Sequence, residues 1–344
     1  MKKLLVLIGS VCLALMLALP LVGACAAPTP EKIVIKMNTS LDPPVREDMG
    51  QNPLAWALEW FCDTVAERTE GQLSFEIYWL SELGVKGTED LRAVRDGLLE
   101  VTASPDGYIA GDIPELMVAG QPILMSATEY PKIAPKINPI LDKTLTEKWG
   151  VVPIAYWPIE EQILNSIKPM DSVDDFAGIK LRGWNPGHMA LAKALGASPV
   201  TVSMSELYVA YQRGVCDAII TGFGTYLNLK LYEVGKYFNT IPINSGLIFV
   251  YFNKDVFNSL PKNIQEIILE VADESSQFHL NTALAGYYKT YDKAADFGMT
   301  NVNFPPEELE KIRAKAPVIW EEWADSNGPV AQELLRITRE TLGR

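Results

Sequence analysis

One arginine stands where its chemistry could be used. Arg182 ends a short apolar strand pattern and precedes a turn built from Trp184, Asn185, Pro186 and Gly187. A guanidinium group presents a planar set of N–H donors that matches a carboxylate in a bidentate manner. We therefore expect Arg182 to hold the acid group of a small organic ligand and Trp184 to form a wall of the pocket. The alternatives are a structural salt bridge of Arg182 and core packing of Trp184.

Alternating helix and strand patterns must position these residues. The stretch 178–222 predicts strand, loop, helix, strand, helix and strand. A similar alternation of strands and helices is predicted in the first half, where residues 32–37 form the first strand. Such alternation is typical of an α/β fold. Because ligands bind beyond the carboxyl ends of the strands in such sheets, we expect residues 38–41 at the rim of a site. The same argument places Asp106 and Tyr108 there.

A long helix is expected near the end of the chain. Residues 261–297 contain no proline after Pro261 and a single glycine, Gly286. A continuous helix over this range would be about 55 Å long, which is enough to span two lobes. The alternative is a pair of helices broken near Gly286. A last helical region is expected to split around Gly328-Pro329.

Composition and motifs argue against several function classes. The net charge of −13 disfavours nucleic acid and anionic membrane as partners. The two histidines, His188 and His279, have no metal-ligand spacing, and the sequence contains no Cys-x-x-Cys, nucleophile elbow or phosphate-binding loop. The acids Glu160 and Glu161 are adjacent, so they need not face one pocket. We therefore expect no enzyme activity, no metal and no cofactor.

The first residues predict export. Two lysines precede an apolar run over residues 4–21, a pattern that indicates a signal peptide over residues 1–24. Cys25 follows Val22-Gly23-Ala24, which resembles a bacterial lipobox, so we expect a lipidated Cys25 and a tether over residues 25–31. The alternatives are an ordinary signal peptide and a retained membrane anchor. Cys62 and Cys216 lie far apart, and buried free thiols are favoured over a disulfide.

An ordered set of motifs resembles the solute-binding proteins of TRAP (tripartite ATP-independent periplasmic) transporters. In the second half these are Asp175, Gly178, Lys180-Leu181-Arg182, Ala194-Leu195-Gly196-Ala197-Ser198-Pro199-Val200, Ser205-Glu206-Leu207-Tyr208, Gln212, Gly214 and Asp217. In the first half, Thr69-Glu70-Gly71-Gln72-Leu73 and the helix pattern with Glu89, Leu91, Val94, Asp96 and Gly97 also resemble the family. The resemblance covers about residues 32–330.

This resemblance implies a two-lobed periplasmic binding protein fold in which each lobe is a sheet flanked by helices and a long helix spans both. We expect residues 32–158 and 247–289 to form lobe I, and residues 159–246 and 290–344 to form lobe II. An organic acid would be held in the interlobe cleft and delivered to TRAP membrane permease subunits. The protein would be periplasmic or at the cell surface, and would contact the membrane only through its lipid anchor.

The resemblance also suggests which residues surround the ligand. Arg182 matches the family's carboxylate-binding arginine, Lys168 matches a second basic residue, and Met204 and Thr221 match positions that commonly line the pocket. Besides these, the sequence itself leads us to expect Trp184, Phe223, Asp106 and Tyr108 as ligand-binding residues. The alternative for Lys168 is a solvated side chain, and for Trp184 and Met204 it is core packing. Where the family often has Asp-Gly-Gln-Glu-Asn, this chain has Asp217-Ala218-Ile219-Ile220-Thr221, which replaces an amide contact by a hydroxyl.

These departures disfavour a highly hydroxylated sugar acid and favour an aromatic or short aliphatic carboxylate. Two other functions remain as alternatives. A ligand-binding sensor or accessory subunit would use the same cleft but would pass its signal to a signalling partner. An exported enzyme on the same scaffold would need an acid, a base or a nucleophile that converge on one site.

Overall fold

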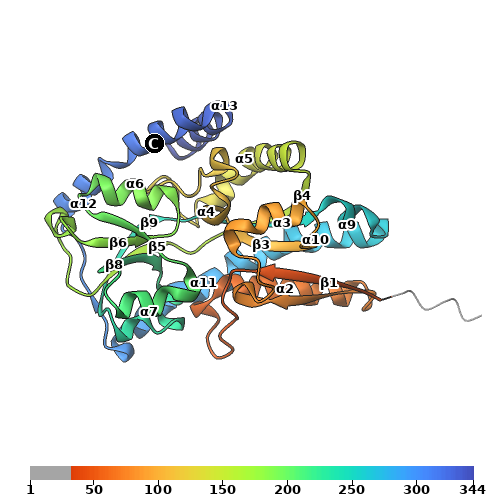
Figure 1. Cartoon of the computed structure of the whole chain (residues 1–344), viewed down its shortest axis with the longest axis horizontal. Helices are drawn as coiled ribbons and strands as arrows, with labels where there is room; N and C mark the ends of the chain where they lie inside the picture. Colours follow the sequence, from red (N-terminus) through yellow and green to blue (C-terminus); the bar gives the residue numbers. More distant parts are fainter. Residues whose placement is uncertain (1–31) are drawn as a thin grey trace, which may run out of the picture. The chain divides into compact units, whose positions relative to one another are not determined.

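The computed structural model describes residues 32–344, and residues 33–344 form one compact body that is built on two β-sheets. The first sheet has the order β2 (Leu73–Tyr78), β1 (Ile33–Thr39), β3 (Val101–Pro105), β10 (Leu247–Asn253) and β4 (Val151–Pro158). The second has the order β11 (Thr300–Asn301), β9 (Tyr237–Asn244), β5 (Gln162–Ser166), β8 (Ala218–Gly222), β6 (Lys180–Gly183) and β7 (Ser198–Thr201). Figure 1 shows the two sheets in separate halves of the body.

Helices cover both sheets. They are α2 (Pro53–Arg68), α3 (Asp90–Arg95), α4 (Asp106–Ile109), α5 (Tyr130–Thr144), α6 (Pro186–Ala194), α7 (Leu207–Gln212), α8 (Phe223–Asn228), α9 (Lys254–Ser259), α10 (Lys262–Phe278), α11 (Leu284–Tyr288), α12 (Pro306–Arg313) and α13 (Ala316–Leu342). The arrangement confirms the expected fold class of two α/β lobes.

The first sheet is buried on both faces. Along β10, Phe249 and Tyr251 pack into one apolar core, while Val250 and Phe252 pack into another. Successive side chains of a strand point to opposite faces, so each face of the sheet has its own core. The second sheet follows the same rule, because Ile219 of β8 and its neighbours Ala218 and Ile220 belong to different cores.

Strand direction fixes which ends meet. In the first sheet β1, β2 and β3 are mutually parallel, and β10 is antiparallel to both β3 and β4. In the second sheet β8 and β7 each run parallel to β6, whereas β5 runs antiparallel to β8. The carboxyl ends of β1, β3 and β4 therefore share one edge of the first sheet, and those of β6, β7 and β8 share one edge of the second.

Two strand connections cross between the sheets, from β4 to β5 and from β9 to β10. They are tied together, because the Ile159 N–H donates to the Gly246 carbonyl at 2.9 Å and the Ser245 hydroxyl donates to the Ile159 carbonyl at 2.6 Å. A motion of one lobe against the other must therefore bend these crossings.

The expected long helix is confirmed as one continuous helical run. Helix α10 continues without a break through the π-helical residues His279–Ala283, α11 and the 3₁₀-helical residues Lys289–Phe297, and Gly298 ends the run at φ 65°. Ile268 of α10 packs into a first-sheet core, whereas Tyr287 of α11 packs into a second-sheet core. The run therefore spans both lobes (Figure 1).

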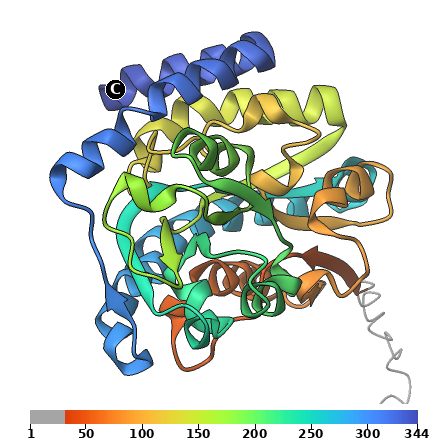
Figure 2. The same cartoon turned by 60° about the vertical axis from the view of Figure 1, so that its left-hand side comes forward.

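The C-terminal helix α13 bends at Gly328, where φ is 81°, as expected from Gly328-Pro329. Its Trp320 and Leu334 belong to the same core as Ile133 of α5, and Figure 1 and Figure 2 both show α13 beside α5. Helix α13 thus packs beside a helix of lobe I, and its Ile319 also belongs to a core of the second sheet. The expected lobe boundaries remain predictions.

Within residues 32–344, no helix combines the length and the apolar character needed to cross a membrane. The expected signal peptide, lipidated Cys25 and tether lie outside these residues. Cys62 and Cys216 are both buried free thiols, which confirms the favoured reading of those two cysteines.

Candidate functional site

Two adjoining cavities lie between the lobes. The inner one has a volume of about 50 Å³ and the outer one about 1240 Å³. Four residues line both of them, Ser40, Tyr108, Trp184 and Met204, so the inner cavity is the floor of the outer one. Ser40 and Tyr108 come from lobe I, and the other two come from lobe II. Together the two cavities form a cleft, which we define by these lining residues.

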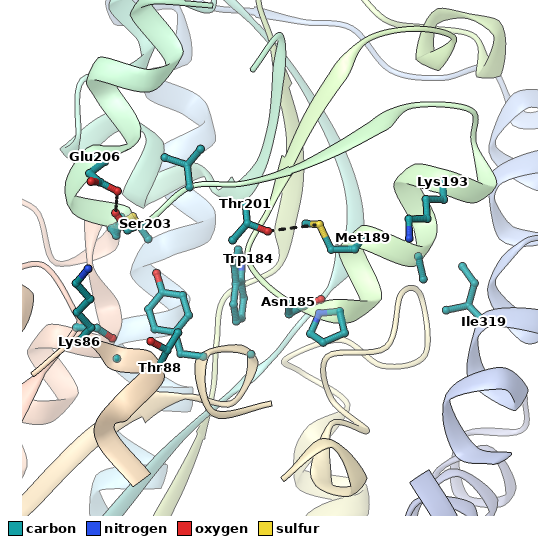
Figure 3. A pocket seen from close by; sticks show the side chains of 18 of the residues that line it. Lys86, Thr88, Trp184, Asn185, Met189, Lys193, Thr201, Ser203, Glu206 and Ile319 are labelled. Atoms are coloured by element: carbon teal, nitrogen blue, oxygen red, sulfur yellow. Dashed lines mark hydrogen bonds between the residues drawn. The ribbon is translucent and has the colours of Figure 1, made fainter. Parts of the chain in front are cut away.

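The carboxyl ends of strands supply the cleft, as expected from the fold. Ser40 follows β1 and Tyr108 lies on α4 directly after β3, while Trp184 follows β6. Met204 lies just beyond β7, and Thr221 is the second-to-last residue of β8. In the view of Figure 3, Trp184 lies between Lys86 and Thr88 from lobe I and Thr201 from lobe II.

Arg182 is fully buried next to this cleft. Its Nε and Nη2 donate to the Val202 carbonyl at 3.2 and 2.9 Å, and Nη1 donates to the Ile220 carbonyl at 3.5 Å. No Asp or Glu forms a salt bridge with it within residues 32–344. Burial lowers the pKa of Arg182, and the neighbouring Tyr108 opposes this shift. Burying a charge without an opposite charge is costly. An anion bound next to this guanidinium would therefore stabilise it.

Tyr108 covers the guanidinium from the other lobe. Tyr108 and Arg182 are close enough that each influences the pKa of the other, and burial raises the Tyr108 pKa. Its ring meets the Trp184 indole edge-on at 6.2 Å between centroids. Gly107 permits this packing, because a Cβ there would lie 2.6 Å from the Trp184 ring. The indole N–H donates to the Gln162 side-chain oxygen at 2.9 Å, which fixes the orientation of the wall.

Two acids also line the inner cavity. Asp42 and Glu160 are 5% and 3% exposed. Burial raises the pKa of Asp42 to about 6 and that of Glu160 to about 7. Sequence reasoning missed both. The adjacent acids do not share this cavity, because Glu160 lines it and Glu161 does not. Glu161 instead accepts from the Ala127 N–H at 3.2 Å and the Tyr288 hydroxyl at 2.6 Å.

The rim of the outer cavity is partly basic. Lys86, Lys193 and Lys315 line it together with Glu206 and Glu322, and all three lysines are exposed. Figure 3 shows Lys86 and Lys193 on opposite sides of the opening. In a chain with a net charge of −13, these lysines provide local positive potential where an anion would enter.

The structure brings together five of the eight expected ligand-binding residues. Trp184, Met204, Thr221 and Tyr108 line the inner cavity, and Arg182 lies directly behind Tyr108. Their contacts with a ligand remain predictions, because only the cavity walls are defined.

The other three expected residues lie elsewhere. Lys168 is exposed and follows the end of β5, and because β5 is antiparallel to β8, this end points away from the cleft. Phe223 is fully buried and stacks on Tyr291 at 4.9 Å between ring centroids, as part of a core. Asp106 is buried behind the cleft wall, where its carboxylate accepts from the Gly107 N–H at 2.7 Å.

The two histidines are enclosed by polar partners. His188 contacts the Asn244 side-chain oxygen at 2.5 Å through Nε2, and burial lowers its pKa to about 3. His279 contacts the Pro158 carbonyl at 2.6 Å. In the part of the chain that the structure describes, no cluster of three or more His, Cys, Asp or Glu side chains could hold a metal ion.

Comparisons with known proteins agree with this geometry. Residues 49–327 match the family described as bacterial extracellular solute-binding protein, family 7. A solute-binding protein from Albidiferax ferrireducens is 28% identical over 297 residues, which cover 82% of this chain and 84% of the relative.

Two solved structures share the fold. An extracytoplasmic solute receptor of Bordetella pertussis that binds pyroglutamic acid has a TM-score of 0.81 at 24% identity, covering 89% of this chain and 99% of that one. A TRAP periplasmic solute-binding protein from Desulfovibrio salexigens with bound orotic acid has a TM-score of 0.78 at 26% identity, covering 91% and 99%. The chain therefore belongs to the family 7 bacterial extracellular solute-binding proteins, the TRAP solute receptors that the sequence motifs resemble.

Proposed function

We propose that this protein captures a small organic acid in the cleft and delivers it to the membrane subunits of a TRAP transporter. The observation that carries this proposal is the fully buried Arg182, which no acid of residues 32–344 neutralises. A carboxylate would supply the missing negative charge and accept two N–H bonds from one guanidinium. Two similar solute receptors bind pyroglutamic acid and orotic acid, which supports the same ligand class.

Entry of a ligand to Arg182 requires the two lobes to separate. Arg182 is covered by Tyr108, which comes from the opposite lobe. Opening the cleft about the two strand crossings would withdraw the Tyr108 hydroxyl and expose the guanidinium to an entering carboxylate. Reclosure would exclude water and strengthen the charge interaction in a lower dielectric.

A thermal-shift screen of matched acids and amides tests the proposal. Each carboxylate is paired with its own primary amide, which keeps the shape but removes the charge. Because a ligand that binds only the folded state stabilises it by mass action, we expect some acids to raise the melting temperature and their amides to leave it unchanged. The proposal is wrong if amides stabilise the protein as well as the acids do, or if no small carboxylate stabilises it.

Delivery and anchoring are separate parts of the proposal. We expect membrane vesicles that contain the permease subunits to accumulate the acid only when this protein is added. We also propose that Cys25 is lipidated after removal of residues 1–24. Cys25→Ser should then move the protein from the membrane fraction to the soluble fraction without changing its affinity for the acid, and retention in the membrane fraction would contradict lipidation.

A further inference from the structure

The inner cavity holds more negative charge than a plain carboxylate ligand would favour. Asp42 follows β1 in lobe I, and Glu160 lies in the crossing between β4 and β5. Both line the inner cavity, and both are more than nine-tenths buried. Within residues 32–344 neither carboxylate forms a salt bridge with a lysine, arginine or histidine. The cleft therefore has a negative end in addition to its buried arginine.

Glu160 is the less satisfied of the two acids. Its Oε1 accepts from the Thr225 hydroxyl at 3.5 Å, a long hydrogen bond, and its Oε2 has no hydrogen-bond partner within the described residues. The carboxyl packs against the Cα of Gly222, where any larger residue would collide with it. Buried polar atoms are normally paired, so an unpaired carboxylate oxygen on a cavity wall points to a donor from a ligand.

Asp42 reinforces the same end of the cavity. Its Oδ2 accepts from the Asn228 side-chain amide, so one of its oxygens is engaged. The two acids line the same small cavity, and after burial the charge of Asp42 is the largest side-chain influence that raises the pKa of Glu160. Two neighbouring acids repel unless a proton or a cation lies between them.

Arg182 interacts with a different set of groups. The groups that influence its pKa, after burial, are Tyr108 and Cys216, and neither Asp42 nor Glu160 is among them. The acids and the arginine therefore do not neutralise each other. The two acids line the inner cavity, whereas Arg182 donates to the Val202 and Ile220 carbonyls beside Tyr108, so they offer two subsites of opposite charge.

We propose that the ligand is an organic acid that also carries a cationic nitrogen, an ammonium or amidinium group, which binds at Glu160 and Asp42 while its carboxylate binds at Arg182. This inference rests on the proposed function, because it adds a second subsite to the same cleft. A zwitterion of this kind brings each buried charge its opposite charge. A nitrogen-free acid would satisfy Arg182 alone and would add a negative charge close to two others.

The direction of the pH dependence separates the two ligand classes. Burial raises the pKa of Glu160 to about 7. A cationic nitrogen requires the ionised carboxylate, so its affinity should fall as the pH drops from 8 to 5.5. A nitrogen-free acid prefers the protonated form, so its affinity should rise over the same range.

The other titratable groups that face Glu160 would not reverse these slopes. They are its neighbour Glu161 and the hydroxyls of Tyr287, Tyr288 and Tyr291 from the long helical run. Burial raises the pKa of each of these tyrosines, so they stay neutral between pH 5.5 and 8. Glu161 accepts from the Tyr288 hydroxyl, away from the unpaired oxygen of Glu160.

The test is a thermal-shift and calorimetric comparison of acids matched in carbon skeleton. The zwitterionic probes are proline, 4-aminobutyrate and guanidinoacetate, each beside its nitrogen-free counterpart, which for proline is cyclopentanecarboxylate. Pyroglutamate serves as an acid whose N–H is uncharged. We expect the strongest binder to be a zwitterion, with affinity that falls on acidification. A nitrogen-free acid or pyroglutamate as the strongest binder overturns the inference but leaves the proposed function intact. Failure of every carboxylate overturns both.

Two matched variants locate the subsite. Glu160→Gln keeps the shape of the side chain and removes its charge, so it should weaken the best zwitterion at least about tenfold and abolish the pH dependence. The same substitution should leave a nitrogen-free acid unchanged or tighten its binding. Glu270→Gln is the control and should change neither, because Glu270 is an exposed residue of α10 outside both cavities. Equal affinity of the zwitterion for wild type and Glu160→Gln contradicts the proposal, provided that the variant retains a cooperative melt.

Discussion

Replacement of Arg182 by methionine separates a ligand-binding role from a structural one. Methionine is unbranched and apolar, so it fills much of the same space without charge. Arg182 is fully buried, and its three hydrogen bonds reach the carbonyls of Val202 and Ile220 rather than any acid. The substitution therefore leaves two carbonyls without these donors but removes an uncompensated buried charge.

These two effects oppose each other in the ligand-free protein. Each unpaired carbonyl costs about 1–3 kcal/mol, and release of an unpaired buried charge returns several kcal/mol. We expect the free energy of unfolding without ligand to change by less than about 2 kcal/mol. Binding of the acid should instead weaken by about 3–5 kcal/mol, which is roughly 150- to 5,000-fold, because the ligand carboxylate is left buried without a partner.

Urea unfolding of the ligand-free protein and calorimetric titration of the best carboxylate measure the two quantities. Lys168→Met is the matched control, because it removes a positive charge on an exposed side chain outside the cleft. It should change neither stability nor affinity. The reasoning fails if Arg182→Met costs more than about 3 kcal/mol of stability while the affinity stays near normal, because that pattern belongs to a structural residue.

Further predictions concern the Tyr108 side chain beside Arg182, the contact between Gly50 and the long helical run, and two buried aspartates. Tyr108→Phe removes a hydroxyl beside Arg182 that competes with a ligand for the guanidinium, so calorimetry should show acid affinity raised by up to about tenfold; weaker binding would mean that the hydroxyl contacts the acid instead. Gly50→Ala should lower the melting temperature markedly, because its Cβ would collide with the Gly286 backbone; an unchanged melt would refute that contact. Burial raises the pKa of Asp90 and of Asp106 to about 7, above their unfolded values near 3.8. The folded state therefore binds more protons between pH 4 and 7, and the melting temperature should fall as the pH rises from 5.5 to 7.5; a rise would show that other groups dominate.

Local patterns predicted the large elements well. Residues 262–297 contain no proline, and this predicted the long helical run because helix continuity depends mainly on residues close in sequence. Its start after Pro261 and its end at Gly298 also follow from local backbone preferences. The packing of α13 on α5 was not predicted, because amphipathic faces do not identify the surface against which they pack.

Only part of the candidate site could be predicted from the sequence. The carboxyl-end rule predicted Tyr108 at the rim, and Tyr108 lines both cavities, as does Trp184, which directly follows β6. Lys168 was misplaced because the direction of β5 in its sheet depends on long-range pairing with β8. Among 43 acidic residues, nothing local distinguishes Glu160 or Asp42, and only their burial beside the inner cavity reveals them.

The crystal structure of the protein with its best-binding carboxylate tests the central claim most directly. The account predicts both carboxylate oxygens within hydrogen-bonding distance of the Arg182 guanidinium, with the Tyr108 hydroxyl displaced from it. An acid bound elsewhere, or one in the cleft with Arg182 still covered by Tyr108, would contradict the account.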